Sequence, residues 1–257
     1  PIPSKIKNKI VYDAVRDIEK IAKSVDFVFC ALNMNKDETR KLEEKYAKAE
    51  CPVISNNSAN RGICDIPMII PEINAHHMDV IPYQKTRLGT KKGFIATKSN
   101  CSIQCYVPAL HPLFEFEIDK ILVCTYQAIS GAGKTFETWP EMKDNIIPFI
   151  QGEEEKSEQE PLKIWGEVKN GEIIPNKNIN ITSQCLRVPV TDGHTAAVFV
   201  SFKTQISPKD AIQKLKNFKG HEKSRNLPSS TSQFINYFED NSRPQIKIDR
   251  EIEKGMG

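Results

Sequence analysis

Four short strings of the chain hold side chains that could together carry out covalent chemistry on a carbonyl group. Their functional residues are Cys101, Gln127, Glu160 with Lys163, and Arg187 with His194. An enzyme of this kind needs a nucleophile, a general acid or base, and cations or amides that hold a negatively charged substrate. Each string by itself is a weak signal. Glu160 and Lys163 could form an ordinary salt bridge on a helix, and Arg187 could lie on a surface strand.

Cys101 has the local sequence expected of a reactive thiol. It lies in the polar string 97–102, after the strand-like segment 93–96 and before the apolar segment 106–110. At a strand-to-helix junction, backbone N–H groups and the positive end of a helix dipole lower the pKa of a thiol. An inert thiol near a turn is an equally open interpretation of this string. The other six cysteines form no C-x-x-C pair and no zinc-type spacing with histidine, so we expect them to be buried or incidental and predict no metal site.

The elements before Cys101 alternate between helix and strand patterns. Apolar spacing predicts a helix over 13–23, a buried strand over 25–32, a helix over 37–50 and a short strand over 51–55. A polar loop rich in Asn and Ser follows. Strand–helix–strand units with polar loops are typical of a doubly wound α/β sheet, whose ligands bind at the carboxyl ends of the strands. The G-x-G-x-x-G pattern that holds a pyrophosphate is absent from the 257 residues.

The segments after Cys101 have a different residue pattern, with longer β-type runs. Three long β-type runs, at 120–128, 180–190 and 194–204, predict an antiparallel sheet and a second domain. Arg187 and His194 would then stand at the two ends of one hairpin-like unit.

Helical patterns lie among and after these runs. Residues 138–160 are expected to hold a helical stretch that ends in an acidic run, and 207–219 predict a surface helix. The chain beyond residue 226 is loop-like. Four histidines match no chemical pattern and are expected at the surface: His76, His77, His111 and His221.

Composition narrows the functional classes. The chain has 36 Lys and Arg against 33 Asp and Glu, with no basic block, which argues against a nucleic-acid partner. Its longest apolar stretches are much shorter than the roughly 18 residues that span a bilayer. The first nine residues lack the apolar core of a signal peptide. We therefore expect no membrane partner and a cytoplasmic location.

Taken together, the strings resemble aspartate-semialdehyde dehydrogenase of the archaeal and fungal type. The likeness is carried by S-N-C-S at 99–102, Q-A-I-S-G-A-G at 127–133, D-N-I-I-P-F-I-Q-G-E-E-E-K at 144–156 and R-V-P-V-T-D-G-H at 187–194. It implies an α/β plus α+β protein, with a partial Rossmann-type NADP-binding domain and a glyceraldehyde-3-phosphate-dehydrogenase-like catalytic and dimerisation domain. The corresponding ranges are 1–100 and 101–242, with a segment 243–257 that returns toward the NADP-binding domain.

The resemblance implies a reaction and a set of roles. The reaction is the NADPH-dependent reductive dephosphorylation of 4-phospho-L-aspartate to L-aspartate 4-semialdehyde, in the biosynthesis of lysine, threonine and methionine. Cys101 would form a thioester, His194 would act as acid and base, and Gln127 would orient the acyl group. Arg187 would clamp the substrate α-carboxylate, and Glu160 would meet its ammonium group.

Two further groups of residues follow from the same resemblance. Donors implied to hold the phosphate group are Lys163, Asn100 and Arg61. Residues implied to lie beside the NADP cofactor are Ala31, Ser130 and Gly131. The family also implies a homodimer or homotetramer, in which the catalytic-domain sheet forms a two-fold interface.

The chain departs from the family pattern at both ends, where the glycine-rich loop and a C-terminal helix are missing. We therefore expect a fragment, or an incomplete description, of a full enzyme, with an uncovered sheet edge and an exposed apolar face.

Three other functions stay open. Malonyl-CoA reductase looks similar and also uses a Cys thioester, although it lacks the equivalent of Asn100. N-acetyl-glutamyl-phosphate reductase would leave Glu160 without an ammonium partner. A noncatalytic dimerisation module would keep the fold without a reactive thiol.

Overall fold

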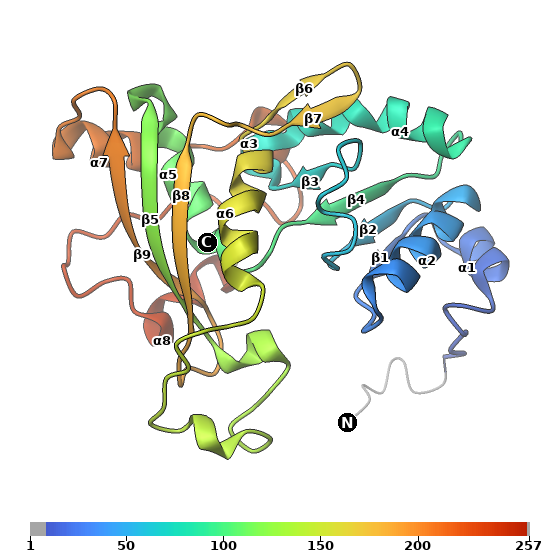
Figure 1. Ribbon diagram of the computed structural model, residues 1–257, viewed down its shortest axis with the longest axis horizontal. Helices are drawn as coiled ribbons and strands as arrows, with labels where there is room; N and C mark the ends of the chain where they lie inside the picture. The colour runs from blue at the N-terminus through green and yellow to red at the C-terminus, as the bar shows by residue number, and fades with distance from the viewer. Residues whose placement is uncertain (1–8, 256–257) are drawn as a thin grey trace.

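The computed structural model describes residues 9–255, which form two main β-sheets with helices packed on them (Figure 1). The first sheet is entirely parallel, with the strand order β1-β2-β4-β3. Its strands are β1 (Val28–Cys30), β2 (Val53–Ser55), β3 (Met68–Ile69) and β4 (Ile95–Lys98). The accompanying helices are α1 (Ile18–Ser24), α2 (Lys36–Lys48), α3 (Pro71–Asn74), the 3-10 helix η2 (Ala75–Val80) and α4 (Ile81–Leu88).

Helix α2 shows why this unit folds as the sequence predicted. The side chain of Asn35 accepts a hydrogen bond from the Glu38 N–H and caps the first turn. Leu42 and Tyr46, four positions apart, are buried in one core cluster with Val53 and other strand residues. This end of the chain therefore has its own small hydrophobic core.

Two sequence predictions for the first unit are wrong in detail. The helix expected from residue 13 begins only at Ile18, because residues 14–16 form a turn. The strand expected to be buried over 25–32 is short and lies at the edge of the sheet, where Phe27 and Phe29 are 48% and 77% exposed. An edge strand has a neighbour on one side only, so its apolar residues are not enclosed. The expected uncovered edge is thus present in the structure.

The second sheet carries the chain's long strands. It has the order β8-β5-β9, and a separate two-stranded ribbon pairs β6 with β7. The strands are β5 (Ile118–Gln127), β6 (Glu167–Lys169), β7 (Glu172–Ile174), β8 (Asn180–Arg187) and β9 (Thr195–Phe202). The helices are α5 (Val107–Leu110), α6 (Glu153–Ile164), α7 (Pro208–Asn217) and α8 (Ile246–Asp249). Short 3-10 helices are η3 (Ile103–Cys105), η4 (His111–Phe116), η5 (Ile129–Ala132), η6 (Pro140–Met142), η7 (Glu222–Ser224) and η8 (Ile252–Gly255).

The predicted antiparallel sheet is only half right. Strands β5 and β9 are antiparallel, but β5 and β8 are parallel. A long connection that contains α6 joins β5 to β8, and such a crossover lets two strands run in the same direction. Because β8 and β9 lie on opposite sides of β5, Arg187 and His194 do not belong to one hairpin.

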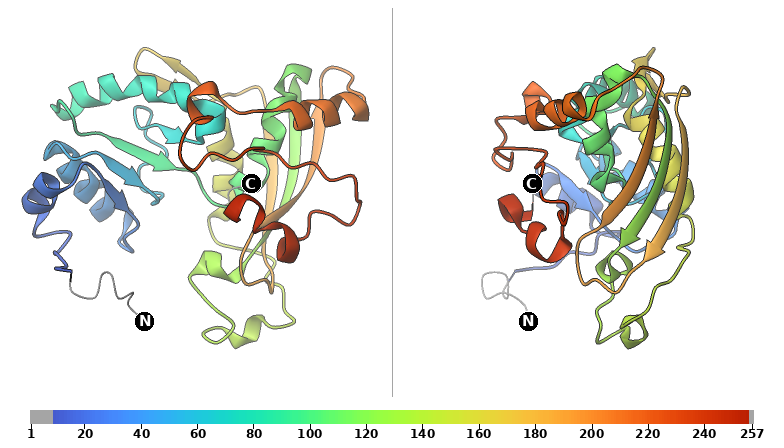
Figure 2. Two further views of the ribbon diagram at one scale, coloured as in Figure 1. Left: turned by 180° about the vertical axis from the view of Figure 1, so that it is seen from behind. Right: turned by 90° about the vertical axis from the view of Figure 1, so that its left-hand side faces the viewer.

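The acidic run that begins at Glu153 lies at the start of a helix, whereas the sequence predicted that it ends one. Helix α6 begins with Glu153 and its acidic neighbours, so the run opens a helix instead of ending one. Carboxylates are favourable there because the helix N-terminus carries partial positive charge. Helix α7, in contrast, begins as predicted, with Ser207 as its cap. The segment after α7, drawn red, runs over the side of the molecule seen from behind in Figure 2.

One hydrophobic cluster joins the two units. It combines Met68, Ile70 and Ile73 with residues of α5, β5 and α6. The first unit therefore meets the second through packed side chains. Among the described residues, no helix is long and apolar enough to cross a membrane. Residues 9–255 also contain no cluster of three or more His, Cys, Asp or Glu side chains that could hold a metal ion.

The prediction that His77 lies at the surface is wrong. The ring is fully buried, with Nδ1 3.1 Å from the amide nitrogen of Asn74 and Nε2 3.0 Å from the carbonyl oxygen of Gly166. An amide NH2 only donates and a carbonyl only accepts, so this is a neutral ring with its proton on Nε2. Burial lowers the pKa of His77 from 6.5 to about 4.

We expect His77 to make the protein sensitive to acid. In the folded state the ring resists protonation, whereas the unfolded chain binds a proton near pH 6.5. Its contribution to the free energy of unfolding is thus complete above pH 6.5 and decreases as the pH falls toward 4, by up to about 3 kcal/mol. Urea unfolding at about pH 7 and about pH 4.5 measures this loss. His77→Gln should reduce this pH dependence, and an unchanged pH dependence in that variant would contradict the assignment.

Candidate active site

Several chain segments end at one place between the two sheets. Strand β4 leads directly into Asn100 and Cys101, and β5 ends at Gln127, which is paired in register with Arg187 at the end of β8. Strand β9 begins one residue after His194. Helix α6 lies beside these strand ends (Figure 1). The structure therefore brings together the four strings that sequence analysis singled out.

Cys101 and His194 form the pair at the centre of this site. The Sγ of Cys101 lies 3.3 Å from Nε2 of His194, and the N–H of Ala128 donates to Nδ1 at 3.0 Å. Because a backbone N–H can only donate, Nδ1 is the unprotonated nitrogen and Nε2 carries the proton of the neutral ring. Burial, followed by the charge of Arg187, lowers the pKa of His194. At neutral pH the imidazole thus presents an N–H group to the sulfur atom.

Arg187 and Gly131 lie against the same imidazole. Arg187 is buried and donates from Nη1 to the carbonyl oxygen of Ala128 at 2.7 Å. A Cβ atom added to Gly131 would come 3.0 Å from that Nη1 and 3.2 Å from Nε2 of His194. The backbone of η5 therefore approaches both groups so closely that a Cβ at position 131 would require them to shift by a few tenths of an ångström.

Glu160 connects the nucleophile segment to the loop after β2. Its Oε1 accepts from Arg61 Nη1 at 3.0 Å, and its Oε2 accepts from the backbone N–H of Asn100 at 2.6 Å. Arg61 also donates from Nη2 to the carbonyl of Asn56, while its buried Nε has no partner among residues 9–255. Glu160 is therefore not the surface half of an i,i+3 salt bridge with Lys163.

Lys163 lies buried beneath the same loop. Its ammonium group donates to the carbonyl oxygens of Arg61, Ile63 and Ile66 at 2.6 to 2.8 Å. These three bonds use all three N–H groups of a lysine. Burial lowers the pKa of Lys163 to about 8. Its implied phosphate role stays a prediction, and it would require one of these bonds to be exchanged.

The side chain of Asn100 is also fully engaged. Its Nδ2 lies 3.0 and 3.2 Å from the two carboxylate oxygens of Glu153, and its Oδ1 accepts from the N–H and the hydroxyl of Ser102. These bonds hold the backbone on both sides of Cys101. A direct contact of Asn100 with phosphate stays a prediction.

Two of the residues implied to lie beside a cofactor, Ala31 and Ser130, are exposed to solvent. Ala31 follows β1 at the carboxyl end of the parallel sheet and is exposed. Ser130 is exposed in η5, and its N–H donates to the carbonyl of Thr191 at 3.2 Å. Their position at strand ends is the one where α/β sheets bind ligands.

Sequence reasoning missed Glu153 and Lys98. Glu153 is buried and contacts Asn100, Gln127 and Lys156, although the sequence shows it only as part of an acidic run. Helical spacing would have found it. Glu153 and Glu160, seven positions apart, are both buried and share one face of α6.

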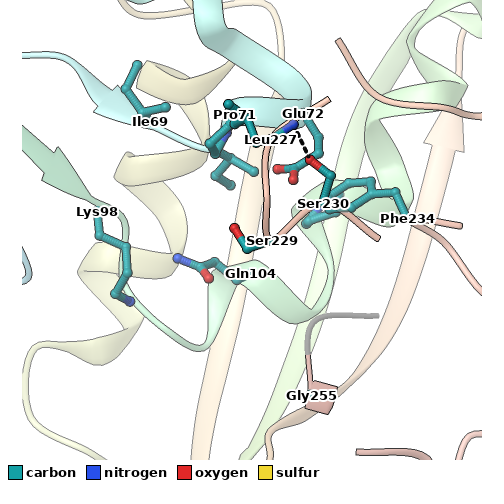
Figure 3. Close-up of a pocket in the computed structure, with 12 residues that line it drawn as sticks. Ile69, Pro71, Glu72, Lys98, Gln104, Leu227, Ser229, Ser230, Phe234 and Gly255 are labelled. Atoms are coloured by element: carbon teal, nitrogen blue, oxygen red, sulfur yellow. Dashed lines mark hydrogen bonds between the residues drawn. The ribbon is translucent and has the colours of Figure 1, made fainter. Parts of the chain in front are cut away.

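Lys98 lines a cavity beside the nucleophile segment (Figure 3). The cavity has a volume of about 470 Å³. Lys98 and Gln104 bound it from the segment around Cys101, and Leu227, Ser230 and Phe234 bound it from the C-terminal segment. Cys101 and His194 are not among its lining residues, so the cavity adjoins the catalytic pair without containing it.

Two family models match this chain. The one described as "Semialdehyde dehydrogenase, NAD binding domain" matches residues 2–81, and "Semialdehyde dehydrogenase, dimerisation domain" matches residues 110–255. With the parallel sheet and the mixed sheet described above, they define the class of the protein as a semialdehyde dehydrogenase, an α/β oxidoreductase.

Individual relatives narrow the class to one family. Aspartate-semialdehyde dehydrogenase of Archaeoglobus fulgidus is 39% identical over 256 residues, covering 98% of this chain and 72% of that protein. The Methanothermobacter thermautotrophicus enzyme is 36% identical over 251 residues, covering 95% and 71%. A crystal structure of the Candida albicans enzyme with NADP superimposes with a TM-score of 0.85 at 32% identity, covering 100% of this chain and 73% of that one. The chain belongs to the aspartate-semialdehyde dehydrogenase family.

Proposed function

We propose that this protein interconverts 4-phospho-L-aspartate and L-aspartate 4-semialdehyde with NADP as the redox cofactor. The observation that carries the proposal is the 3.3 Å approach of Cys101 Sγ to His194 Nε2 at a site lined by buried cationic and amide groups. This arrangement suits a substrate with a carboxylate, an ammonium group and a phosphate. A cytoplasmic location fits such a biosynthetic enzyme.

The thiolate of Cys101 attacks the acyl carbon of the aspartyl phosphate. A C–S bond forms, the C–O bond to phosphate breaks, and inorganic phosphate leaves with its electron pair, so a thioester remains. NADPH, when bound, supplies the hydride that reduces the thioester carbon. The Nε2–H group of His194 donates a hydrogen bond to the resulting oxyanion and keeps its proton. The oxyanion then collapses, the C–S bond breaks, and the aldehyde and the Cys101 thiolate are released.

The remaining side chains hold the substrate. Arg187 has N–H groups left beyond its bond to Ala128, and these suit a bidentate contact with the α-carboxylate. Glu160 meets the ammonium group, and Gln127 orients the acyl group. For the phosphate, Arg61 offers its unpaired buried Nε, and Asn100 and Lys163 join it by exchanging existing bonds.

The residues proposed for the cofactor fit a bound nicotinamide. The space that a Cβ at Gly131 would occupy lies directly beside the His194 ring, so glycine leaves this space free for a ligand near the reacting atoms. Ser130 and Ala31 are both exposed, and each lies in a segment that follows a strand. We keep residues 1–100 as the NADP-binding unit, 101–242 as the catalytic unit and 243–257 as a returning segment.

The test is the reverse reaction of the full-length protein. We expect NADP to be reduced in the presence of aspartate semialdehyde, and only when inorganic phosphate is added. Omission of phosphate is the control, because a thioester needs phosphate to be released as the acyl phosphate. Reduction of malonyl-CoA with NADPH, without phosphate-dependent turnover of the semialdehyde, would instead assign the protein to the acyl-CoA reductases.

The protein assembles as an oligomer, as its dimerisation domain indicates. We propose that the pair is formed through the outer face of the second sheet. There Leu122 of β5 and Phe199 of β9 are paired neighbours that are 55% and 72% exposed. Contiguous apolar surface of this kind marks an interface, and a two-fold contact is the commonest form. A homodimer, or a tetramer built from such dimers, follows.

We expect Phe199→Glu to dissociate this interface. A carboxylate buried in this apolar interface without a partner would be strongly unfavourable. Light scattering coupled to size exclusion measures the change, with a halved mass as the expected result for a dimer. Met78→Glu changes an exposed apolar residue on η2 and serves as the control. An unchanged mass for Phe199→Glu would move the interface to another face.

A further inference from the structure

We propose that Glu153 is a positioning residue that sets the orientation of two active-site amides, Asn100 and Gln127, so that Gln127 offers its carbonyl oxygen to the substrate. The proposal rests on the function proposed above. Glu153 is the first residue of α6 and is 9% exposed. It lies where that helix meets the segments that follow β4 and β5, and no role follows for it from the motifs of the sequence.

The carboxylate of Glu153 faces hydrogen-bond donors from three segments. Asn100 Nδ2 lies 3.0 Å from Oε2, Gln127 Nε2 lies 3.3 Å from Oε2, and Lys156 Nζ lies 2.6 Å from Oε1. Burial opposes the charge of Glu153, but the bonds from Lys156, Asn100 and Gln127 outweigh it and lower the pKa of this carboxyl group. Glu153 is therefore ionised at neutral pH and can only accept hydrogen bonds.

An accepting carboxylate decides how a neighbouring amide is turned. For Asn100, the NH2 group faces Glu153, so Oδ1 faces the opposite way and accepts from the N–H and hydroxyl of Ser102. Asn100 and Ser102 flank Cys101. The bond to Glu153 thus fixes the backbone that carries the nucleophile.

For Gln127, both N–H groups are used. Nε2 donates to Thr125 Oγ1 at 3.2 Å and to Glu153 Oε2 at 3.3 Å. Its Oε1 makes no hydrogen bond with the described residues and is not among their buried unpaired atoms, so it borders open space. Gln127 then acts toward the substrate as an acceptor, for example of its ammonium group. It does not act as a donor to the acyl oxygen.

The charge of Glu153 also acts on two neighbouring groups of the site, Arg187 and His194. It raises the pKa of both Arg187 and His194, against the larger effect of burial on each. The groups that face His194 are Cys101, Arg187, Lys98 and Glu153. Glu153 is the one carboxylate among these described neighbours, so its removal changes the charge of the site by one unit.

The decisive variant is Glu153→Gln, with Glu155→Gln as the matched control. Glu155 is exposed and lies in the same first turn of α6, so its substitution removes the same charge without touching the amides. A glutamine at 153 places an NH2 group against two other NH2 groups and forces at least one of them to turn. We expect kcat for phosphate-dependent oxidation of aspartate semialdehyde to fall by about 100-fold, because misplacement by about an ångström has this effect. Glu153→Asp, which keeps the charge, should recover part of the loss.

Coupling to Gln127 separates positioning from mere loss of structure. In a Gln127→Ala background, where no amide remains to be turned at that position, Glu153→Gln should have a clearly smaller effect on kcat than in the wild type. Fully additive effects would overturn the proposal, as would a kcat of Glu153→Gln within about twofold of the wild type.

A second readout does not depend on turnover. The rate of alkylation by iodoacetamide at a fixed pH, followed for single peptides by mass spectrometry, should change for Cys101 in Glu153→Gln, because Asn100 no longer holds the backbone beside the nucleophile. Cys64 is exposed and serves as an internal reference whose rate stays the same. An unchanged Cys101 rate would contradict the proposal. Wild-type protein without turnover, but with the changed Cys101 rate in Glu153→Gln, would instead contradict the proposed reaction alone.

Discussion

Replacement of Cys101 by serine is expected to abolish phosphate-dependent oxidation of aspartate semialdehyde, which is the largest effect that we predict. A hydroxyl group is far less ionised than a thiol, and His194 already carries its proton on Nε2 and cannot remove another from serine in this orientation. Loss of a nucleophile that acts as a unit with its partner lowers kcat by about 10⁴-fold or more. Initial rates of NADP reduction at saturating semialdehyde and phosphate measure the loss.

The control for this substitution is Cys64→Ser. Cys64 is also exposed, and its Sγ lies 3.4 Å from Glu172, away from the catalytic pair. Its substitution should leave kcat unchanged. Equal urea-unfolding curves for Cys101→Ser and the wild type would show that the fold is intact. Retention of more than a tenth of the wild-type kcat in Cys101→Ser would remove Cys101 from the mechanism.

The second large effect concerns His194. Substitution by alanine removes the Nε2–H donor that faces Cys101 and that hydrogen-bonds the oxyanion formed on reduction. Loss of one such donor lowers kcat by about 10²- to 10³-fold, and we expect a loss of this size. His194→Gln keeps an amide N–H donor that cannot titrate. We expect it to recover part of the kcat that His194→Ala loses.

The pH dependence of kcat follows from the same ring. Burial and Arg187 lower the pKa of His194, so the neutral form persists below the usual range of histidine. As the pH falls through this lowered pKa, a proton is added to Nδ1 and opposes the N–H of Ala128. The acid limb of the pH profile should therefore lie below pH 6.5 in the wild type and be absent in His194→Gln. An acid limb above 6.5 would show that the ring is not held in this tautomer.

The sequence by itself determined the local elements and the types of the reacting groups. Spaced apolar residues and the caps Asn35 and Ser207 specify α2 and α7, because these signals act within a few residues along the chain. The string around Cys101 indicated the nucleophile for the same reason. Its place after a strand follows from β-type residues that directly precede it.

Only the tertiary structure decided which groups meet and which direction the strands take. Cys101 and His194 are 93 positions apart in the sequence, and Arg61 and Glu160 are 99 positions apart. The three hydrogen bonds of Lys163 each join residues about 100 positions apart. Hydrogen bonds act over about 3 Å, so their partners depend on packing that local spacing does not encode. Such packing buries Lys163 against carbonyl oxygens, leaves Phe29 on an open edge and makes β8 parallel to β5. It also turns one residue of an acidic run, Glu153, into the acceptor that organises two active-site amides.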